Sequence, residues 1–587
     1  MRNLIYLLIL PVLFISCKKD YLQRDLGAAL IADSVFSNAD YLSNFADNSY
    51  NYMIDDFGHL NAPNYVKGTT GQFSDEAVGS SAADFSPFLT AMTKGTFLAP
   101  NATDVVDMYE RMYEGIRNVN VTLSKIDSVN WSGANYSPDL IRAQMYFLRA
   151  FFYFELAKRF GGVVLLDKPL NKDDKIDVPR SSFDSTILFI SSDLDKSEQI
   201  LSTTTFTLGA DVIYTPDGWN VNNYGRSTVG AVRALRSKVF LLAASPQHNS
   251  SGDLIKWQKA AQAAYDVIKM KKYSLITNGY GTLLNQNQSS VSSPEYILMK
   301  VRRNRNLAGF LDDFVIPPSL GGKQAMIYPT QNHVDLYEMK TTGRPIADPA
   351  SGYNPQNPYA NRDPRLDFNV VRNGVTWADR VIEIYEGGKD YQPTSNAFTA
   401  TGYYCKKLWP AQYKPSVAVP RQLLNFVYFR YADILLAYAE AANEAYGPSV
   451  TPYDDTLSAI KAVNIVRSRP SVVMPALQTT NIAGNGYVRP LKDSVRARIH
   501  NERAVELAFE EVRWWDLMRW KEVHATVPKI MTGMNIKKTG TTTFEYSVLP
   551  LGEIHQRKYT ERNNIYPIPS NEIFKSNGAL EQNAEWK

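Results

Sequence analysis

Apolar residues recur at helical spacing along most of the chain, which predicts a protein built mainly from helices. Residues 138–160 carry apolar side chains around so much of the helix circumference that this helix is expected to be buried on all sides. Helices are predicted at residues 40–52, 105–126, 138–160, 182–200, 229–244, 254–270, 426–446 and 454–467.

Two regions lack this periodicity. Residues 61–100 and 279–425 are rich in Gly, Pro, Asn, Ser or Tyr, and short strands are predicted at 296–301 and 381–385. Long ordered loops on a rigid scaffold often carry function. We expect a single domain over residues 17–587. It comprises a helical scaffold at about 40–278 and 426–525, loop-rich inserts at about 61–100 and 279–425, and a C-terminal tail at 526–587.

Residues 494–521 read SVRARIHNERAVELAFEEVRWWDLMRWK and contain neither Pro nor Gly. This predicts one uninterrupted helix of roughly 40 Å, at about 1.5 Å per residue. Charges of opposite sign stand one turn apart, close enough to interact. These pairs are Arg503 with Glu506, Glu510 with Arg513, and Asp516 with Arg519. Paired charges on such a helix are typical of a structural element.

The N-terminus predicts export and lipidation. Residues 4–15 form an apolar run after Arg2, too short for a membrane span of about 20 residues and typical of a signal peptide. Ser16 and Cys17 follow directly, and this arrangement resembles a bacterial lipoprotein cleavage site. We expect residues 1–16 to be removed and Cys17 to carry the lipid that holds the protein at a membrane. The alternative is an ordinary signal peptide followed by an incidental cysteine.

Composition narrows the possible functions. The 587 residues include 63 Lys and Arg against 59 Asp and Glu, a formal net charge of +4 that gives no support for nucleic-acid binding. Beyond Cys17, Cys405 stands alone, so the sequence offers neither a disulfide framework nor a cysteine zinc site. No HExxH, GxSxG, GxxxxGK[ST] or GxGxxG motif occurs, and no cofactor or metal is predicted.

Aromatic residues make up 12% of the chain, and several lie in segments without core periodicity. Sugar rings pack their flat C–H faces on Trp and Tyr, while their hydroxyl groups bind planar polar side chains. Trp219 and Tyr65 are the strongest candidates because both lie between polar residues. The candidate ligand-binding residues are Tyr65, Asp75, Trp219, Asn222, Tyr224 and Tyr328.

An enzyme remains an alternative from the residues alone. A retaining glycoside hydrolase needs two carboxylates about 5 Å apart. Asp75 and Glu76 are an adjacent acidic pair in an irregular segment, although such pairs more often serve in turns, caps or cation contacts.

Residues 501–520, NERAVELAFEEVRWWDLMRW, resemble the C-terminal signature helix of the SusD/RagB family, surface lipoproteins of nutrient-uptake systems. Glu511 stands where a Gly is common. The resemblance extends along the chain in the same order. It includes FLRAFFYFELAKRFGG at 147–162, GRSTVGAVRALRSKVFLLAASP at 225–246, PTQNHVDLYEM at 329–339, YANRDPRL at 359–366, FRYADILLAYAEAANEA at 429–445, AVNIVRSR at 462–469 and YPIPSNEI at 566–573.

The resemblance implies a mostly helical fold of four tetratricopeptide-like helix pairs with a loop-rich face. It implies a non-catalytic lipoprotein of the outer membrane, facing the exterior. Such a protein binds an oligosaccharide and delivers it to a SusC-like TonB-dependent transporter, on which it sits as a lid. Two alternatives stay open: peptide binding, as in RagB-like members, and a lipid-anchored glycoside hydrolase. The family fixes no ligand-binding residue by a motif, so none is carried over to this chain.

Overall fold

The structure is a computed structural model. It describes residues 36–54, 69–79, 87–98, 103–171, 174–175, 177–277, 279–283, 293–301, 316–321, 327–391, 398–408, 426–477 and 491–587. Cys17 and Tyr65, two of the residues singled out by the sequence, lie outside these ranges.

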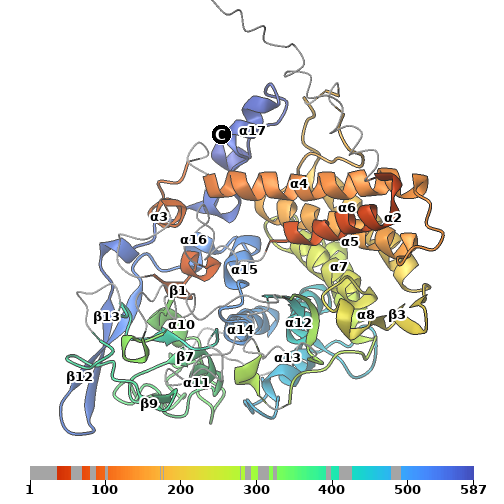
Figure 1. Cartoon of the computed structure of the whole chain (residues 1–587). Coiled ribbons are helices and arrows are strands. Elements are labelled where there is room, and N and C mark those ends of the chain that lie inside the picture. Colours follow the sequence, from red (N-terminus) through yellow and green to blue (C-terminus); the bar gives the residue numbers. More distant parts are fainter. Residues whose placement is uncertain are drawn as a thin grey trace, which may run out of the picture.

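Successive helices pack side by side and form the scaffold of the protein (Figure 1). Among the described residues, none of the helices has both the length and the apolar character required to cross a membrane. The mostly helical, tetratricopeptide-like fold expected from the sequence is confirmed. The scaffold helices are α2 (Ala39–Asn48), α4 (Thr103–Lys125), α5 (Pro138–Phe160), α6 (Phe183–Leu201), α7 (Val229–Ala244), α8 (Leu254–Ile268), α12 (Tyr431–Tyr446) and α13 (Ala459–Arg467).

Helix α5 has the boundaries predicted from the sequence because its ends carry clear signals. The side chain of Ser137 accepts a hydrogen bond from the backbone N–H of Leu140, and Pro138 occupies the first helical position. Gly161 ends the helix with a φ of +77°, a conformation that glycine adopts without strain. Apolar residues on several sides of the helix are buried, including Phe147 and Phe152, so the prediction of a buried helix is confirmed.

The segment before α12 is a strand, and the predicted helix over residues 426–446 is wrong at its start. Strand β11 (Phe426–Arg430) pairs antiparallel with β5 (Tyr296–Lys300), which was predicted as a strand. The sequence FVYFR is rich in aromatic and β-branched residues, which fit a pleated, half-buried surface. The partner strand, distant in sequence, decides between the two conformations.

Short helices and strands make up the described parts of the two loop-rich inserts, residues 61–100 and 279–425. Helix α3 (Pro87–Lys94) corrects the expectation that residues 61–100 contain no helix. Of the strand predicted at residues 381–385, only Val381 is in a strand. These elements are α10 (Gln331–Val334), α11 (Arg365–Asn369), β1 (Ala77–Val78) paired with β6 (Tyr328–Pro329), β7 (Val370–Val371) paired with β10 (Tyr404–Cys405), and β8 (Thr376–Trp377) paired with β9 (Arg380–Val381).

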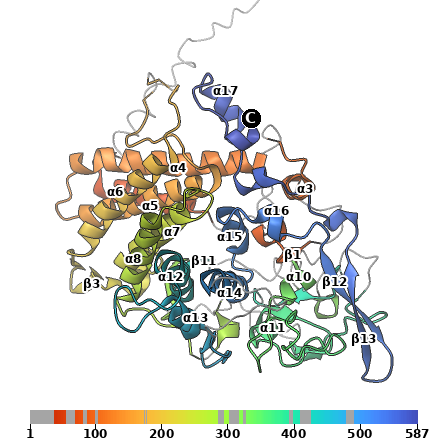
Figure 2. The ribbon, with the colours of Figure 1, turned by 180° about the vertical axis from the view of Figure 1, so that it is seen from behind.

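The C-terminal region covers one side of the scaffold. Strands β12 (Thr532–Lys538) and β13 (Phe544–Pro550) form a hairpin that extends beyond the helices, as Figures 1 and 2 show from opposite sides. Helix α16 (Val523–Thr526) precedes this hairpin, and α17 (Ser570–Lys575) lies near the C-terminus, close to α4.

The predicted continuous helix over residues 494–521 is broken into two. Helix α14 (Leu491–Glu506) ends early, and α15 (Arg513–Arg519) begins after an irregular turn. Within this turn Phe509 and Glu511 have φ angles of +59° and +63°, in the left-handed region. Glycine adopts this region without a steric penalty. This explains why the signature sequence that residues 501–520 resemble commonly has a Gly at the position of Glu511.

Contacts with the segment that holds η3 (Thr70–Phe73) and β1 stabilise this turn. The backbone N–H of Phe509 donates to Oε1 of Glu76 at 2.8 Å. The carboxylate of Glu511 accepts hydrogen bonds from both the backbone N–H and the hydroxyl of Thr70, each at 2.6 Å. Tertiary hydrogen bonds therefore override the helical pattern of the sequence at this point.

The break also changes the ion pairs expected from helical spacing. Asp516 and Arg519 interact at 2.9 Å, as predicted. Arg503 contacts Asp516 and not Glu506. Glu510, within the turn, and Arg513, at the start of α15, pair with residues from other elements. Glu510 contacts Arg430 and Lys407, and Arg513 contacts Asp75.

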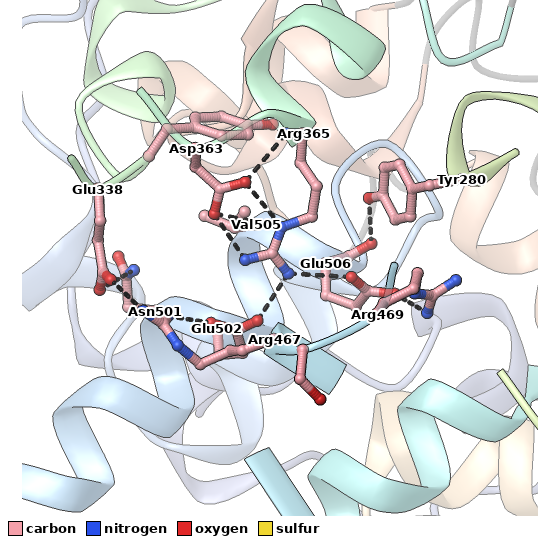
Figure 3. Close-up of polar contacts among 12 residues, drawn as sticks. Tyr280, Glu338, Asp363, Arg365, Arg467, Arg469, Asn501, Glu502, Val505 and Glu506 are labelled. Carbon is pink, nitrogen blue, oxygen red and sulfur yellow. Dashed lines mark hydrogen bonds and ion pairs between the residues drawn. The ribbon is translucent and has the colours of Figure 1, made fainter. Parts of the chain in front are cut away.

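The carboxylates of α14 point into a buried ionic network (Figure 3). Glu502 contacts Arg365 at 2.6 Å and Arg467 at 2.7 Å. Glu506 contacts Arg365 at 3.0 Å and Arg469 at 2.8 Å. All five side chains are at most 2% exposed. Burial alone would raise the pKa of Glu506, but the surrounding guanidinium groups lower it to about 2.

We expect Arg365→Leu to destabilise the protein strongly. The change leaves the buried carboxylate of Asp363 without its guanidinium partner and removes a cation from Glu502 and Glu506. Removing one partner from a buried ionic cluster lowers the free energy of unfolding by about 3–5 kcal/mol. Urea unfolding followed by circular dichroism measures this difference.

The matched control is Arg142→Leu on α5. Arg142 pairs with Asp127 and Asp139, whose side chains are 81% and 61% exposed. Exposed pairs contribute at most about 1 kcal/mol. A loss of stability in the control as large as that in Arg365→Leu would contradict the role assigned to the buried network.

A second prediction concerns pH and Glu76. Burial is the main reason why the pKa of the Glu76 carboxyl rises from 4.5 to about 7, and the negative charge of Asp75 acts in the same direction. The backbone N–H of Phe509 and the cations Arg513 and Lys407 lower the pKa but do not cancel the rise. Among the described residues, no donor contacts Oε2 of Glu76. Between pH 4.5 and about 7 the folded protein therefore keeps a proton on Glu76 that the unfolded chain releases. The stability that neutral Glu76 contributes is fully present below pH 4.5 and is lost as the pH rises through about 7.

Glu76→Gln keeps a neutral acceptor for Phe509 at every pH. We expect the unfolding midpoint temperature of this variant, minus that of the unmodified protein, to increase as the pH rises from 4.5 to 8 and to level off there. Thermal unfolding at a series of pH values measures this. Glu114→Gln, at an exposed position of α4, should show no such trend. A flat difference for Glu76→Gln would show that Glu76 is ionised in the folded protein throughout.

Candidate functional site

A small three-stranded sheet lies between α6 and α7 and carries Trp219. Strands β2 (Phe206–Leu208), β3 (Asp211–Thr215) and β4 (Gly218–Trp219) pair antiparallel in that order, and η6 (Val221–Asn223) follows. The sheet packs beside α8 at one edge of the scaffold (Figures 1 and 2). Tyr214 is fully buried and donates its hydroxyl to the carbonyl of Leu201 at the end of α6, at 2.9 Å. This contact fixes the sheet to the helices.

The indole of Trp219 is held in one orientation by its neighbours. Its ring lies 4.9 Å from the ring of Tyr214, the residue opposite it in the sheet. Its Nε1 donates a hydrogen bond to the carbonyl of Ser227 at 2.7 Å. The side chain is half-buried, so part of the ring stays open to solvent. A half-exposed ring with a fixed orientation is suited to contact a ligand.

Arg226 supports Trp219 from the scaffold side. Its guanidinium group lies 5.5 Å from the centre of the indole ring. Two hydrogen bonds, at 2.6 and 2.7 Å, connect the same group to the carboxylate of Asp47 on α2. A planar, bidentate pair of this kind holds the arginine in place and compensates its charge.

Trp219 forms one wall of an open cleft with a volume of about 210 Å³. The opposite wall comes from β5 and from the residues that follow α8. The side chains of Tyr224, Tyr273 and Tyr296 line the cleft together with Trp219. Its polar lining residues are Asp217, Asn223, Arg226, Thr228, Lys272 and Ser293.

The tyrosine hydroxyl groups around the cleft remain protonated at neutral pH. Burial raises the pKa of Tyr273 to about 12, and burial also raises the pKa of Tyr224. Neutral hydroxyl groups can both donate and accept hydrogen bonds. The cleft thus combines aromatic faces with uncharged hydroxyl and amide groups, as recognition of a polyhydroxylated ring requires.

Sequence reasoning placed part of this site. Trp219 and Tyr224 both line the cleft. Asn222 is exposed on η6, next to Asn223, whose side chain is the one that lines the cleft. Tyr65 lies outside the described residues, so its place relative to the cleft stays a prediction.

Asp75 and Tyr328 lie together elsewhere, at the pairing of β1 with β6. Tyr328 is fully buried opposite Val78. Asp75 is 4% exposed, and both of its carboxylate oxygens accept hydrogen bonds from Arg513 at 2.9 Å. Glu76 is 1% exposed. The geometry therefore does not favour these residues as ligand contacts, or the acidic pair as acid and base acting on a glycan.

The sequence did not point to the opposite wall of the cleft. Tyr273 and Lys272 follow a helix, and Tyr296 lies in a strand that reads as buried core. Their spacing carries no signal for a ligand. Only the packing of β5 and the end of α8 against the Trp219 sheet brings them to the same cleft.

Two other hollows are less suited to a saccharide. A cavity of about 110 Å³ between α5, α7 and α12 has about half the volume of the Trp219 cleft. A broader cleft of about 630 Å³ between α14 and α16 has no Trp, Tyr or Phe among its described lining residues. In the described part of the chain, no group of three or more His, Cys, Asp or Glu side chains is placed to hold a metal ion.

Comparison with known proteins gives the family. Residues 285–586 match the model of the SusD family, and residues 68–216 match a model described as starch-binding associating with outer membrane. SusD-like protein P38 of Formosa agariphila is 24% identical over 431 residues, which cover 72% of this chain and 73% of that protein.

Solved structures share the fold. A SusD-like protein from Bacteroides fragilis has a TM-score of 0.73 at 24% identity, covering 94% of this chain and 98% of that one. A SusD-like carbohydrate-binding protein from the same species has a TM-score of 0.70 at 21% identity, covering 93% and 99%. A laminarin-binding SusD-like protein has a TM-score of 0.59 at 19% identity, covering 93% and 99%. With more than half of its length matched by the family model and the same fold throughout, the chain belongs to the SusD family.

Proposed function

We propose that this protein is a non-catalytic glycan-binding lipoprotein of the outer membrane. In this proposal Cys17 carries the lipid anchor and the protein faces the exterior. It captures an oligosaccharide at the Trp219 cleft and passes it to a SusC-like TonB-dependent transporter. The observation that carries the proposal is the fixed, half-exposed indole of Trp219 facing a cleft of tyrosine and amide groups. The carbohydrate-binding relatives named above support it.

The cleft is built for capture with little reorganisation. The ring of Trp219 and the guanidinium of Arg226 are already held by hydrogen bonds from the scaffold. A site that is ordered before binding loses less conformational entropy when the ligand arrives. One sugar face on the open side of the indole would remove about 100 Å² of apolar surface from water, roughly half of what an aromatic side chain can bury.

The lining of the cleft supports binding without turnover. Glycoside hydrolysis uses a pair of carboxyl groups that flank the bond to be broken. Among the described residues that line the cleft, Asp217 is the one with a carboxylate. Peptide binding depends more on backbone hydrogen bonds and charges than on flat aromatic faces, so the cleft favours a glycan over a peptide.

Trp219→Ala should weaken oligosaccharide binding by about 50-fold or more. Burial of about 100 Å² of apolar surface, on the indole and the sugar face together, at about 25 cal/mol per Å² corresponds to about 2.5 kcal/mol. Isothermal titration calorimetry of the purified protein against panels of oligosaccharides and peptides measures the loss. Binding of peptides alone would replace the glycan with a peptide ligand.

Trp131→Ala is the matched control. Trp131 is also half-buried and also donates its Nε1 to a backbone carbonyl, that of Ile126, but it is not among the residues that line the cleft. Its loss should leave glycan affinity within about twofold of the unmodified protein. If both variants bind as well as the unmodified protein, the glycan site lies elsewhere.

The anchor and the partner have their own test. Cys17→Ala removes the thiol that would carry the lipid, so the protein should move from the outer-membrane fraction to the soluble fraction. Cell fractionation with immunoblotting measures this. Purification of the unmodified protein in mild detergent should also recover a TonB-dependent transporter. A Cys17→Ala protein that stays fully in the membrane contradicts the anchor, and the absence of any barrel protein contradicts the partner.

A further inference from the structure

Lys272 places a positive charge in the Trp219 cleft. The residue follows α8, and its Nζ lies beside Gly218, 3.6 Å from the position that a Cβ of residue 218 would take. Gly218 has a φ of +127°, which disfavours any other residue. The ammonium group therefore lies beside the backbone of β4, and Lys272 and Trp219 are both among the residues that line the cleft.

The two cations of the cleft, Lys272 and Arg226, differ in whether a carboxylate pairs with them. Arg226 forms its bidentate pair with Asp47. Within the described ranges, no carboxylate forms an ion pair or hydrogen bond with Lys272. Desolvation lowers the pKa of Lys272, and the charge of Asp217 opposes that shift without reversing it. A partly desolvated cation that no carboxylate contacts directly favours an anionic ligand.

Asp217 does not cancel this preference. It lies in the turn between β3 and β4, exposed to solvent, with its backbone N–H bound to the hydroxyl of Thr215. Water and salt screen a carboxylate at such a position. The Lys272 side chain is exposed as well, but desolvation lowers its pKa, so its ammonium group gains from an anionic partner, while Asp217 remains available for sugar hydroxyl groups.

We propose that the cleft selects acidic oligosaccharides, with the Lys272 ammonium group binding a carboxylate or sulfate on a sugar ring that stacks against Trp219. The inference rests on the proposed glycan-binding function and adds the class of glycan. Trp219 provides the contact shared by all pyranose rings, and Lys272 provides the discrimination between charged and neutral ones.

Calorimetry with matched probes tests the inference. The probes are tetragalacturonate and its methyl ester, which lacks the negative charges and carries an added methyl group at each carboxyl, and a sulfated galactose tetrasaccharide and its desulfated form. At least one charged probe should bind about tenfold or more tightly than its neutral partner. A preference confined to the first pair identifies a carboxylate as the recognised group, and a preference confined to the second identifies a sulfate.

Lys272→Met should bring the affinity for the charged probe down to that for its neutral partner, while neutral binding changes by less than about twofold. Raising NaCl from about 50 to about 500 mM should weaken charged binding to the unmodified protein and leave the variant unaffected. Lys271→Met is the control, because Lys271 is exposed, as Lys272 is, but is not among the described lining residues.

The inference is overturned if Lys272→Met retains the preference for the charged probe, or if the unmodified protein binds the neutral probe as tightly as the charged one. The proposed function survives either result as long as Trp219→Ala abolishes binding of the neutral probe. If Trp219→Ala leaves binding of every probe unchanged, the glycan-binding role of the cleft fails together with the inference.

Discussion

Carboxylates of α14 and of the turn that follows it lie inside the protein, where guanidinium and ammonium groups from distant segments surround them. Glu502, Glu506 and Glu510 contact cations from the middle region, from the start of α12 and from the end of α13. A buried charge is tolerated where its partners are in place. Removing one partner lowers the free energy of unfolding by far more than the intact pair contributes to it. Other packings of these segments would leave charges unpaired, so the network selects one arrangement.

The turn between α14 and α15 extends this constraint to the N-terminal half. Glu76 and Glu511 form reciprocal contacts between the segment around η3 and the turn, and the Asp75–Arg513 pair lies beside them. Residues more than four hundred positions apart are thereby fixed to each other. Acidic residues that resemble a catalytic pair in the sequence serve here to hold two parts of the fold together.

The candidate glycan site uses the same scaffold in a different way. Asp47 on α2 fixes Arg226, which in turn supports Trp219, while the end of α6 holds the sheet through Tyr214. Rigid helices therefore set the position of a ring that lies in an irregular segment. Lys272, which lines the cleft and forms no ion pair among the described residues, is where the proposed selection for acidic sugars resides.

The sequence by itself determined the helical scaffold, because long amphipathic or apolar periods and clear caps specify helices such as α5 and α7 locally. It indicated the family separately, through the resemblance of segments such as residues 501–520 to the SusD/RagB signature. It also singled out Trp219 and Tyr224, since aromatic residues in an irregular segment without core periodicity are candidates for contact with a sugar ring. Tertiary structure decided the rest. Local periodicity does not encode hydrogen bonds and packing between segments far apart in the chain. Such contacts decide the strand that precedes α12, the break after Glu506 and the wall formed by Tyr273 and Tyr296.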